Sequence, residues 1–419
     1  MTSPWKTLPL WSLATVGREV VEPTDLGVEV VHYSIPSVDA TGTGQVEESE
    51  SIQSAKLRLR GGEVLISKLN PRKSRVLSVA KSAMPIVSST EFVGLRAGSA
   101  LDSRYLAYLL QSESVRQELD SRVQSVTRSH QRVAPEDITH LNVAVPPVGE
   151  QRRIADFLDA ETARMSALRD SLHQFDRDVR ERERAVLADQ LNAGARSVRA
   201  DLPPSWQWTP LMHLTDPLRQ IMYGIVLPGP NVADGVPIVK GGDVAANRLS
   251  LKSLNRTTRE IEAGYARSRL KGGDLVIAIR GSVGEVAVVP DELTGANLTQ
   301  DAARISIERS VHARWLRLVL ESPVVTHQIQ QRVTGATIKG INIWDLKRVF
   351  VPTPDIETQA ALATTVGRAI QTHEDLRSRV AQHDRLLAER RQALITAAVT
   401  GQLDVTTASG RNVTDGVTA

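Results

Sequence analysis

Two segments of the chain carry apolar residues at alternating spacings of four and three, the pattern that forms one apolar seam along a helix. The first seam comprises eight positions: Ile154, Leu158, Met165, Leu168, Leu172, Phe175, Val179 and Val186. The second seam begins 208 residues later in the same frame: Leu362, Val366, His373, Leu376, Val380, His383, Leu387 and Leu394. The pattern predicts two long helices, from Glu150 to Gly194 and from Glu357 to Gly401, each about 65 Å long at 1.5 Å per residue.

Amphipathic helices of this kind are usually ordinary components of bundles or coiled coils. Because the two seams match and a whole domain separates them, we expect the helices to pair with each other in antiparallel orientation. The two histidines in the second seam, His373 and His383, are compatible either with relaxed packing or with a pH-sensitive contact.

The repeat extends into the segment before each helix. Trp5, Pro9, Leu10 and Leu13 recur at an offset of 201, residues 59–66 recur as residues 270–277 at an offset of 211, and Val143, Val145 and Pro146 recur as Val349, Val351 and Pro352 at 206. Small changes of offset within a conserved order are expected of duplicated globular domains that differ in loop length. The chain is therefore predicted to run as domain, helix, domain, helix.

Each domain is expected to mix α and β structure. Short β-rich runs, Val64–Ile66 and Leu275–Ile279, each follow a Gly-Gly turn. Apolar periodicity predicts one helix over residues 103–122 and one over 311–332, and a last strand at 141–145 or 349–351 is stopped by proline. The fold class is thus α+β: two α/β domains separated by two long antiparallel coiled-coil helices, with a pseudo-two-fold internal repeat. The boundaries are 1–146, 147–199, 200–352 and 353–403, followed by a tail, 404–419, that is expected to be disordered.

Composition narrows the class of protein. A chain of 419 residues with 41% hydrophobic residues is long enough for two cores of ordinary domain size. No apolar run reaches 18 residues and the N-terminus does not have the pattern of a secretion signal, so we expect no membrane span. The absence of cysteine excludes disulfides and cysteine ligands, which fits a reducing compartment. A net charge of +3 is modest, so a surface for nucleic acid would have to come from local clusters of cations.

Patterns typical of catalysis are not found. The nine histidines form neither His-x-x-x-His nor His-Glu-x-x-His, and no phosphate-binding Gly-x-x-x-x-Gly-Lys-[Ser/Thr] is present. Arg280-Gly281-Ser282-Val283-Gly284 has its first glycine next to the serine, which is not the spacing of a nucleophile elbow. We therefore expect a protein that is not an enzyme and that binds no metal or cofactor of its own.

Cationic and amide side chains instead cluster after strands, at equivalent places in the two halves. Such side chains contact phosphates and base edges, and their recurrence favours DNA binding over the ordinary interpretation of each cluster as a solvated loop. The predicted DNA-binding residues are Lys68, Asn70, Arg72, Lys73, Arg75, Arg128, His130 and Arg132 in the first half, and Lys240, Arg280, Ser282, Lys339 and Asn342 in the second.

These features together resemble the specificity subunit of type I restriction-modification systems. The resemblance covers residues 1 to 405 and rests on the paired domains, on the junction Pro146-Pro147-Val148-Gly149-Glu150-Gln151 before Arg152-Arg153-Ile154-Ala155, and on Pro203-Pro204-Ser205-Trp206. The second junction, residues 352–359, departs from the first by two inserted residues.

The resemblance implies a subunit without catalytic activity, in the cytoplasm of a prokaryote. Each domain would recognise one half of a bipartite double-stranded DNA target, while the helices would set the spacer and dock two methyltransferase subunits, which in turn engage the restriction (motor) subunits. S-adenosylmethionine, ATP and Mg²⁺ would be used by those partners. The target sequence does not follow from the chain, because base choice depends on loop geometry and DNA shape.

Two alternatives belong to other classes. A coiled-coil adaptor that does not bind DNA would explain the helices but not the paired cationic loops. A DNA-processing enzyme would require a metal or methyl-donor site that the sequence does not contain. Salt-sensitive DNA binding without turnover in the presence of Mg²⁺ and S-adenosylmethionine would distinguish the specificity subunit from both.

Overall fold

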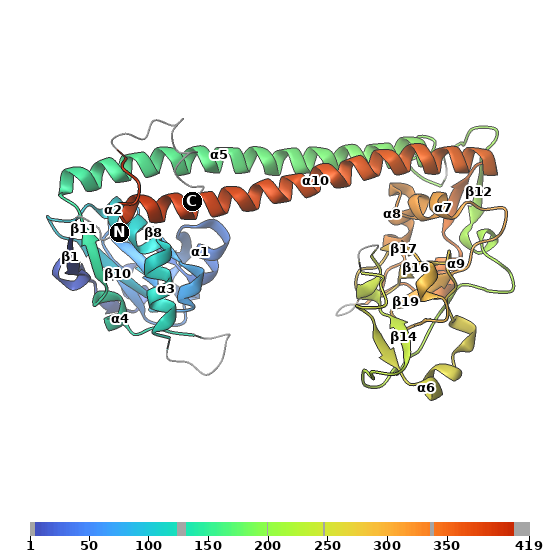
Figure 1. Cartoon of the computed structure of the whole chain (residues 1–419), viewed down its shortest axis with the longest axis horizontal. Coiled ribbons are helices and arrows are strands. Elements are labelled where there is room, and N and C mark those ends of the chain that lie inside the picture. The colour runs from blue at the N-terminus through green and yellow to red at the C-terminus, as the bar shows by residue number, and fades with distance from the viewer. Residues whose placement is uncertain (1–4, 124–130, 199, 246–247, 336–338, 406–419) are drawn as a thin grey trace. The chain divides into compact units, whose positions relative to one another are not determined.

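A computed structural model describes residues 5–123, 131–198, 200–245, 248–335 and 339–405 (Figure 1). The chain divides into two compact units, the first formed by Met1–Leu172 and Ala381–Ala419 and the second by His173–Val380. Two long helices, α5 (Val148–Val186) and α10 (Ile356–Val399), each contribute a part to both units. Every unit therefore consists of one α/β domain with adjoining portions of both helices. The predicted tail, 404–419, lies outside the described residues from 406 onward.

In its described residues, the domain of the first unit contains three sheets. A two-stranded antiparallel ribbon joins β1 (Lys6–Pro9) to β11 (Asn142–Val145). A four-stranded sheet has the order β2 (Ala14–Val16), β10 (Phe92–Ala97), β7 (Val64–Ser67), β8 (Val76–Ser78). A five-stranded sheet has the order β3 (Val20–Val21), β6 (Lys56–Leu59), β9 (Ile86–Ser88), β4 (Glu29–Tyr33), β5 (Gln45–Glu48).

The second unit repeats this topology with a smaller third sheet. Its ribbon joins β12 (Gln207–Pro210) to β20 (Phe350–Thr353). Its four-stranded sheet has the order β13 (Met222–Tyr223), β19 (Ala302–Ile305), β16 (Leu275–Ala278), β17 (Val286–Val288). The third sheet has the order β15 (Asn255–Thr257), β14 (Val236–Val239), β18 (Asn297–Leu298). Because β4 and β9 pair in parallel, as β14 and β18 do, the predicted internal repeat is confirmed at the level of strand order and direction.

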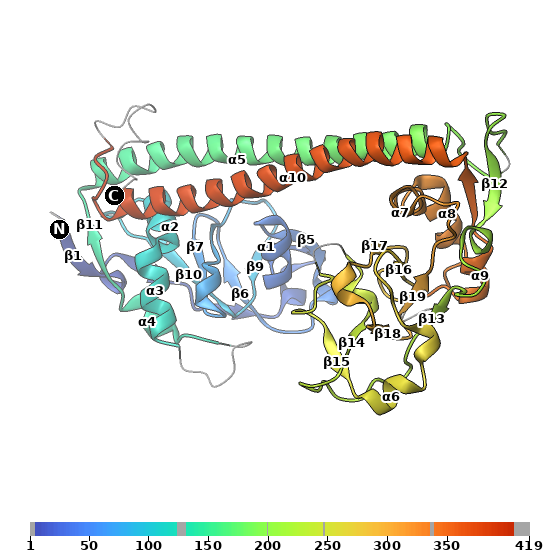
Figure 2. The same ribbon diagram turned by 45° about the vertical axis from the view of Figure 1, so that its right-hand side comes forward.

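Each domain adds short helices, some of which are labelled in Figure 2. In the first unit they are α1 (Ile35–Thr41), α2 (Ser103–Gln111), α3 (Glu113–Ser121) and α4 (Pro135–Thr139). In the second they are α6 (Arg259–Ala263), α7 (Ala313–Leu320), α8 (Pro323–Gln331) and α9 (Ile343–Lys347).

The single helices predicted over 103–122 and 311–332 are each broken in two. Ser112 and Ser322 both have extended backbone with ψ of 151°. Ser112 caps α3, since its hydroxyl accepts the Val115 N–H, and Ser322 precedes Pro323, a position that disfavours helical backbone. The prediction of continuous helices is therefore wrong, because apolar periodicity does not detect an N-cap inside an apolar stretch.

The two long helices pack antiparallel in each unit. In the first unit the Arg169 guanidinium donates to the Asp384 carboxylate, with Nε to Oδ1 at 2.7 Å and Nη2 to Oδ2 at 3.2 Å. In the second unit Arg377 lies 3.4 Å from Asp176 and 3.6 Å from Glu183. The predicted antiparallel pairing is therefore confirmed within each unit.

The seam is buried only where a domain covers it. Ile154, Leu158 and Met165 of α5 are at most 4% exposed, because they pack with α2 and with the end of α10 in the core of the first unit. Leu168 and Phe175 are 51% and 44% exposed, so the predicted apolar seam is not buried along its whole length. A straight helix drifts by about 20° per heptad relative to a 3.5-residue repeat, and two helices alone do not enclose a side chain at the flank of the pair.

Among the remaining seam positions, most are buried or half-buried. Val179, Val366, Val380 and Leu394 are buried. Leu172, Val186, Leu362, Leu376 and Leu387 are half-buried, as is His373, while His383 is exposed.

The ends of the long helices complete the two cores. Leu394 and Val399 of α10 are buried in the core of the first unit. After α5, one turn of π-helix (Leu187–Leu191) places Leu187 and Leu191 in the core of the second. Each domain core thus requires the end of the long helix that begins at the other domain in the sequence.

A buried glutamine fixes the start of each long helix. The Gln151 side chain donates from Nε2 to the carbonyl oxygens of Ala100 (3.0 Å) and Pro146 (2.8 Å) and accepts the Asp102 N–H at Oε1 (2.7 Å). Gln359 makes two of the three equivalent bonds in the second unit: Nε2 donates to the Pro354 carbonyl (2.9 Å) and Oε1 accepts the His312 N–H (2.9 Å). Both glutamines are at most 2% exposed, and Asp102 and His312 are the N-caps of α2 and α7. The sequence analysis named these glutamines only as members of the two junctions and gave them no structural role, although they are themselves 208 positions apart.

The glutamines correct the alignment of the two junctions. The ribbons pair Lys6 with Val145 and Gln207 with Thr353, so the last strand is offset by 208 rather than 206. Pro354 is then the equivalent of Pro146, and the two inserted residues assigned to the second junction do not exist. The shift arose because Val-x-Val-Pro patterns also match when displaced by two residues, the period of a strand.

Glu321 is a half-buried carboxyl group in the second unit, surrounded by other acidic side chains. It caps the C-terminal end of α7, and its Oε2 atom lies 3.4 Å from the Arg317 guanidinium. Burial, together with the negative charges of Glu183, Glu374 and Glu285, raises the pKa of Glu321 to about 7 despite the opposing effect of Arg317. The carboxyl group therefore retains its proton in the folded state at pH values where it is ionised in the unfolded chain.

We expect Glu321→Gln to make the second unit less sensitive to pH. A carboxyl group whose pKa is raised from 4.5 to about 7 destabilises the folded state progressively as the pH rises through that window. The variant should therefore have a higher melting temperature than the original chain above pH 7 and a flatter profile between pH 4.5 and 7. Thermal melts across this range test it, with exposed Glu357→Gln as the control; parallel profiles for Glu321→Gln and the original chain would contradict it.

Candidate nucleic-acid interface

The two cationic clusters predicted in the first half lie side by side. The first follows β7 and the second precedes β11. A β-bridge joins Leu69 to Arg132, and the Asn70 N–H donates to the Gln131 carbonyl at 2.7 Å. The Asn70 side chain accepts the Gln131 N–H at 3.3 Å. Two segments about 60 residues apart thus form one surface at the end of the four-stranded sheet.

The second unit builds the same arrangement. A β-bridge joins Arg280 to Gly340, and the Gly281 N–H donates to the Lys339 carbonyl at 3.1 Å. Lys240 belongs to the same region, since the following turn at Gly241 packs against the backbone of Arg280. Gly281 has φ of +74°, which lets the chain turn immediately after β16. The structure therefore brings together the clusters that the sequence placed at equivalent positions.

Arg75 has a different role from the one predicted. Its guanidinium donates to both carboxylate oxygens of Asp39, at 2.5 and 2.8 Å, and to the Leu69 carbonyl at 3.1 Å. The side chain is 7% exposed. The Arg75 hydrogen bond, with a smaller effect from Lys73, lowers the pKa of Asp39. This pairing leaves no open face for a DNA phosphate, so the assignment of Arg75 is corrected to a structural one: it anchors the loop to α1.

The other predicted residues of the first unit remain accessible to different degrees. Arg72 and Lys73 are exposed, whereas Lys68 and Asn70 are half-buried. Arg132 is 58% exposed and forms a two-fold ion pair with Glu91, at 2.9 and 3.1 Å. Arg128 and His130 lie outside the described residues.

In the second unit, Ser282, Lys339 and Arg280 are exposed, and Arg280 has Asp301 4.0 Å away. Lys240 is half-buried. Asn342 caps α9: its Oδ1 accepts the Asp345 N–H at 2.8 Å and its Nδ2 donates to the Asp345 carboxylate. The amide of Asn342 is thus engaged within the protein, and its first role is to begin a helix beside the cationic loop.

Exposed tryptophans border both cationic surfaces, a feature that the sequence analysis missed. Trp344 in α9 is 62% exposed, with the Arg348 guanidinium 3.6 Å from its ring centre. Trp11 is 59% exposed and lines a cavity that also contains Lys68. Exposed aromatic side chains are recognisable only when burial is known, because periodicity assigns them to the core by default.

Other kinds of site are not found in the part of the chain that the structure describes. No group of three or more histidine or acidic side chains could hold a metal ion among these residues. Within the same residues, no helix is both long and apolar enough to cross a membrane.

Comparison with known proteins shows which proteins this chain is similar to. No protein-family model matches the chain. The chain is 25% identical over 300 residues to the type I restriction enzyme EcoBI specificity subunit of Escherichia coli, covering 68% of this chain and 63% of that protein. It is 22% identical over 358 residues to the EcoKI specificity subunit of Escherichia coli strain K12, covering 81% and 75%. The aligned part thus spans less than two thirds of the EcoBI subunit.

Two solved structures share the fold. A chain from a study of complex assembly and conformational transition of the type I R-M system matches with a TM-score of 0.77 at 21% identity, covering 96% of this chain and all of that one. The HsdS subunit from Thermoanaerobacter tengcongensis matches with a TM-score of 0.54 at 21% identity, covering 96% and 98%. The curated homologues are thus type I restriction enzyme specificity subunits, the fold is that of the HsdS chains, and the predicted resemblance is confirmed.

Proposed function

We propose that this chain is the DNA-specificity subunit of a type I restriction-modification complex and acts in the cytoplasm of a prokaryotic cell. The observation that carries the proposal is the recurrence of one surface in two units: a cationic loop after β7 or β16, paired with a second loop before the last strand. Each surface would contact one half of a bipartite DNA target. The similarity to named specificity subunits supports the same role, and nothing in the comparisons favours an adaptor that does not bind DNA.

The partners follow from the same proposal. Two methyltransferase subunits would dock on the pseudo-symmetric chain, since each unit offers an equivalent surface to the same protein. Restriction (motor) subunits would join through them. The chain itself would perform no chemistry, and S-adenosylmethionine, ATP and Mg²⁺ would be bound by the partners.

We expect each cationic surface to govern one half-site. Arg72→Ala with Lys73→Ala should weaken recognition of one half of the target, and Arg280→Ala with Lys339→Ala should weaken the other. Each phosphate contact that is lost should reduce the slope of log K against log salt by about one unit, whereas a lost base contact should relax preference at one position by about 1–3 kcal/mol.

Methylation mapping and binding isotherms at several salt concentrations measure both effects on the assembled complex. Arg75→Ala is the matched control in the first loop. Because Arg75 is paired with Asp39, this change should lower the melting temperature, while the salt dependence of the protein that remains folded should not change. Equal damage to both half-sites from either pair of substitutions would refute the division of labour.

A further inference from the structure

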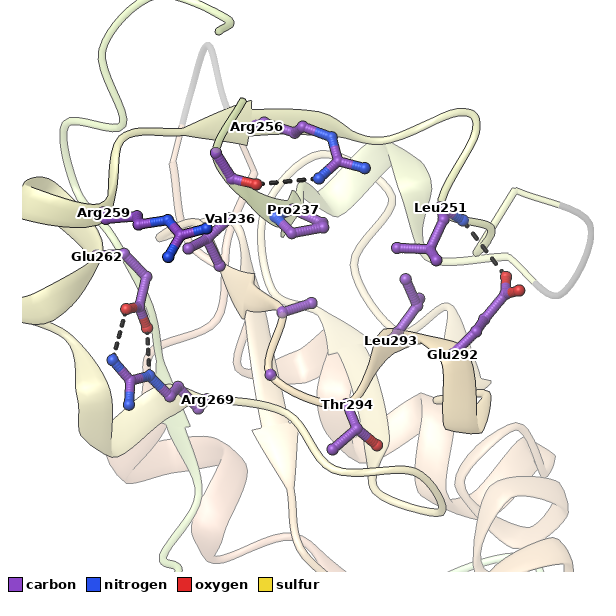
Figure 3. A pocket seen from close by; sticks show the side chains of 13 residues that line it. Val236, Pro237, Leu251, Arg256, Arg259, Glu262, Arg269, Glu292, Leu293 and Thr294 are labelled. Atoms are coloured by element: carbon purple, nitrogen blue, oxygen red, sulfur yellow. Dashed lines mark hydrogen bonds and ion pairs between the residues drawn. The ribbon is translucent and has the colours of Figure 1, made fainter. Parts of the chain in front are cut away.

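Arginines line two adjoining cavities in the second unit, away from the cationic loops. One cavity, of about 590 Å³, lies beside β14, α6 and the segment 292–296 (Figure 3). The other, of about 760 Å³, shares Arg269, Thr294 and Gly295 with it. Together their linings contain seven cationic residues and two acidic ones. We name this surface the arginine groove.

Not all of these charges are available to a ligand. Arg269 forms a two-fold ion pair with Glu262, at 2.6 Å for each contact, and Arg304 is buried among backbone carbonyls. Arg256 donates one hydrogen bond to the Gly235 carbonyl at 3.0 Å and is otherwise directed along the rim of the cavity. The exposed Arg259 side chain forms no hydrogen bond or ion pair within the described part of the chain, and its sequence neighbour Glu260 interacts with it electrostatically. Arg256 and Arg259 therefore have guanidinium N–H groups that can bind an anion.

The equivalent edge of the first unit has the opposite charge. In the first unit, Val31 of β4 pairs with the first residue of the parallel strand β9 and lies opposite Val46 of β5. In the second unit, Ile238 of β14 pairs with the first residue of the parallel strand β18 and lies opposite Asn255 of β15. The next residue in the outer strand is Glu47 in the first unit and Arg256 in the second.

Other acidic side chains extend this edge of the first unit. Glu29 and Glu48 stand directly opposite each other across β4 and β5, and Glu22, Asp25 and Glu50 are exposed nearby in the sequence. Like charges directly opposite on neighbouring strands are unfavourable, and a polyanion would be repelled from such an edge. The two units differ here in charge although they share the same strand topology.

The arginine groove lies within reach of DNA that contacts the loops of its own unit. From Gly235 at the cavity to Lys240 at the cationic loop the chain advances five residues along β14, about 16 Å at roughly 3.3 Å per residue. That distance corresponds to about five base-pair steps of roughly 3.4 Å along a duplex. A duplex held at Lys240 and Arg280 and running along β14 would bring backbone phosphates to Arg256 and Arg259.

We propose that the arginine groove binds phosphates of the DNA that flanks the half-site of the second unit, so that the footprint extends further on this side than on the side of the first unit. The inference rests on the proposed function, and adds a contact that is independent of base sequence. Guanidinium groups suit this task because they offer planar pairs of donors to phosphate oxygens.

The test uses the assembled complex and two trimmed duplexes. One target lacks flanking DNA beyond the half-site governed by Arg280 and Lys339, and the other lacks it beyond the opposite half-site. Only the first trimming should weaken binding. The double variant Arg256→Gln, Arg259→Gln should bind the full duplex as weakly as the original complex binds the first trimmed duplex. For this variant, the slope of log K against log salt should be smaller by about two units.

Controls separate folding, function and ligand identity. Arg259→Gln alone breaks no hydrogen bond in the described structure and should reduce the slope by about one unit without changing the melting temperature. An equal loss of affinity from both trimmings, or no loss from either, would overturn the proposal while leaving sequence-specific binding intact. Failure to bind any bipartite target would instead refute the proposed function. Binding of free ADP that requires Arg259, without dependence on the flank, would show a nucleotide site and would also overturn it.

Discussion

Leu158→Asp is expected to unfold the first unit. Leu158 is fully buried, in a core formed jointly by α2, α5 and the end of α10. A carboxylate placed there has no cationic partner, and its burial costs on the order of several kcal/mol, a large fraction of the roughly 5–15 kcal/mol that stabilises a typical domain. Circular dichroism and thermal melts should show loss of the cooperative transition of this unit.

The matched control is Leu168→Asp on the same helix. Leu168 belongs to the same predicted seam but is 51% exposed, so the same substitution should change the free energy of unfolding by about 0.5 kcal/mol or less. Equal destabilisation of the two variants would contradict this explanation. It would mean that the seam is buried along its whole length, whether or not a domain covers it.

Gln151→Ala and Gln359→Ala are expected to cost about 2–4 kcal/mol each. Truncation of Gln151 leaves the Ala100 and Pro146 carbonyls and the Asp102 N–H without their partner, and an unsatisfied buried group costs about 1–3 kcal/mol. Because the two glutamines lie in different units and share no partner, their effects on chemical denaturation should be additive.

The neighbouring arginine provides the control for the glutamine variants. Arg152 is 67% exposed in its side chain and lies 3.9 Å from Asp102, so Arg152→Ala should change stability by about 0.5 kcal/mol or less. A glutamine variant as stable as the arginine variant would show that the helix start is held by the ribbon and the proline alone.

The repeat and the long helices could be predicted from the sequence because their signal is local and periodic. Seam positions such as Leu158 and Val366 follow a heptad for several turns, and side-chain spacing along a helix needs no knowledge of the partner. Exposure could not be predicted for Leu168 and Phe175, because it depends on whether a domain covers that turn. The break at Ser112 was likewise hidden by the apolar residues on both sides of it.

The position of the candidate interface could be predicted from the sequence, but the side chains that it exposes could not. Recurrence in both halves indicated the loops at Lys73 and Arg280, and the structure brings each loop beside its companion segment. Which cation is free depends on carboxylates that are distant in the sequence: Asp39, which engages Arg75, precedes it by 36 residues. The arginine groove is assembled from several separate segments, so no single stretch of sequence contains its pattern.

The two-stranded ribbons keep the start of each long helix at the same place when the domain before it differs in length. Equivalent positions are 201 residues apart where the chain enters each ribbon and 208 apart where it leaves, yet the ribbon pairs Lys6 with Val145 in one unit and Gln207 with Thr353 in the other. All net insertion between the copies is therefore accommodated inside the loop that each ribbon closes. The loops that each ribbon closes can therefore differ in length without moving the long helix that follows, because the ribbon fixes the point at which that helix begins.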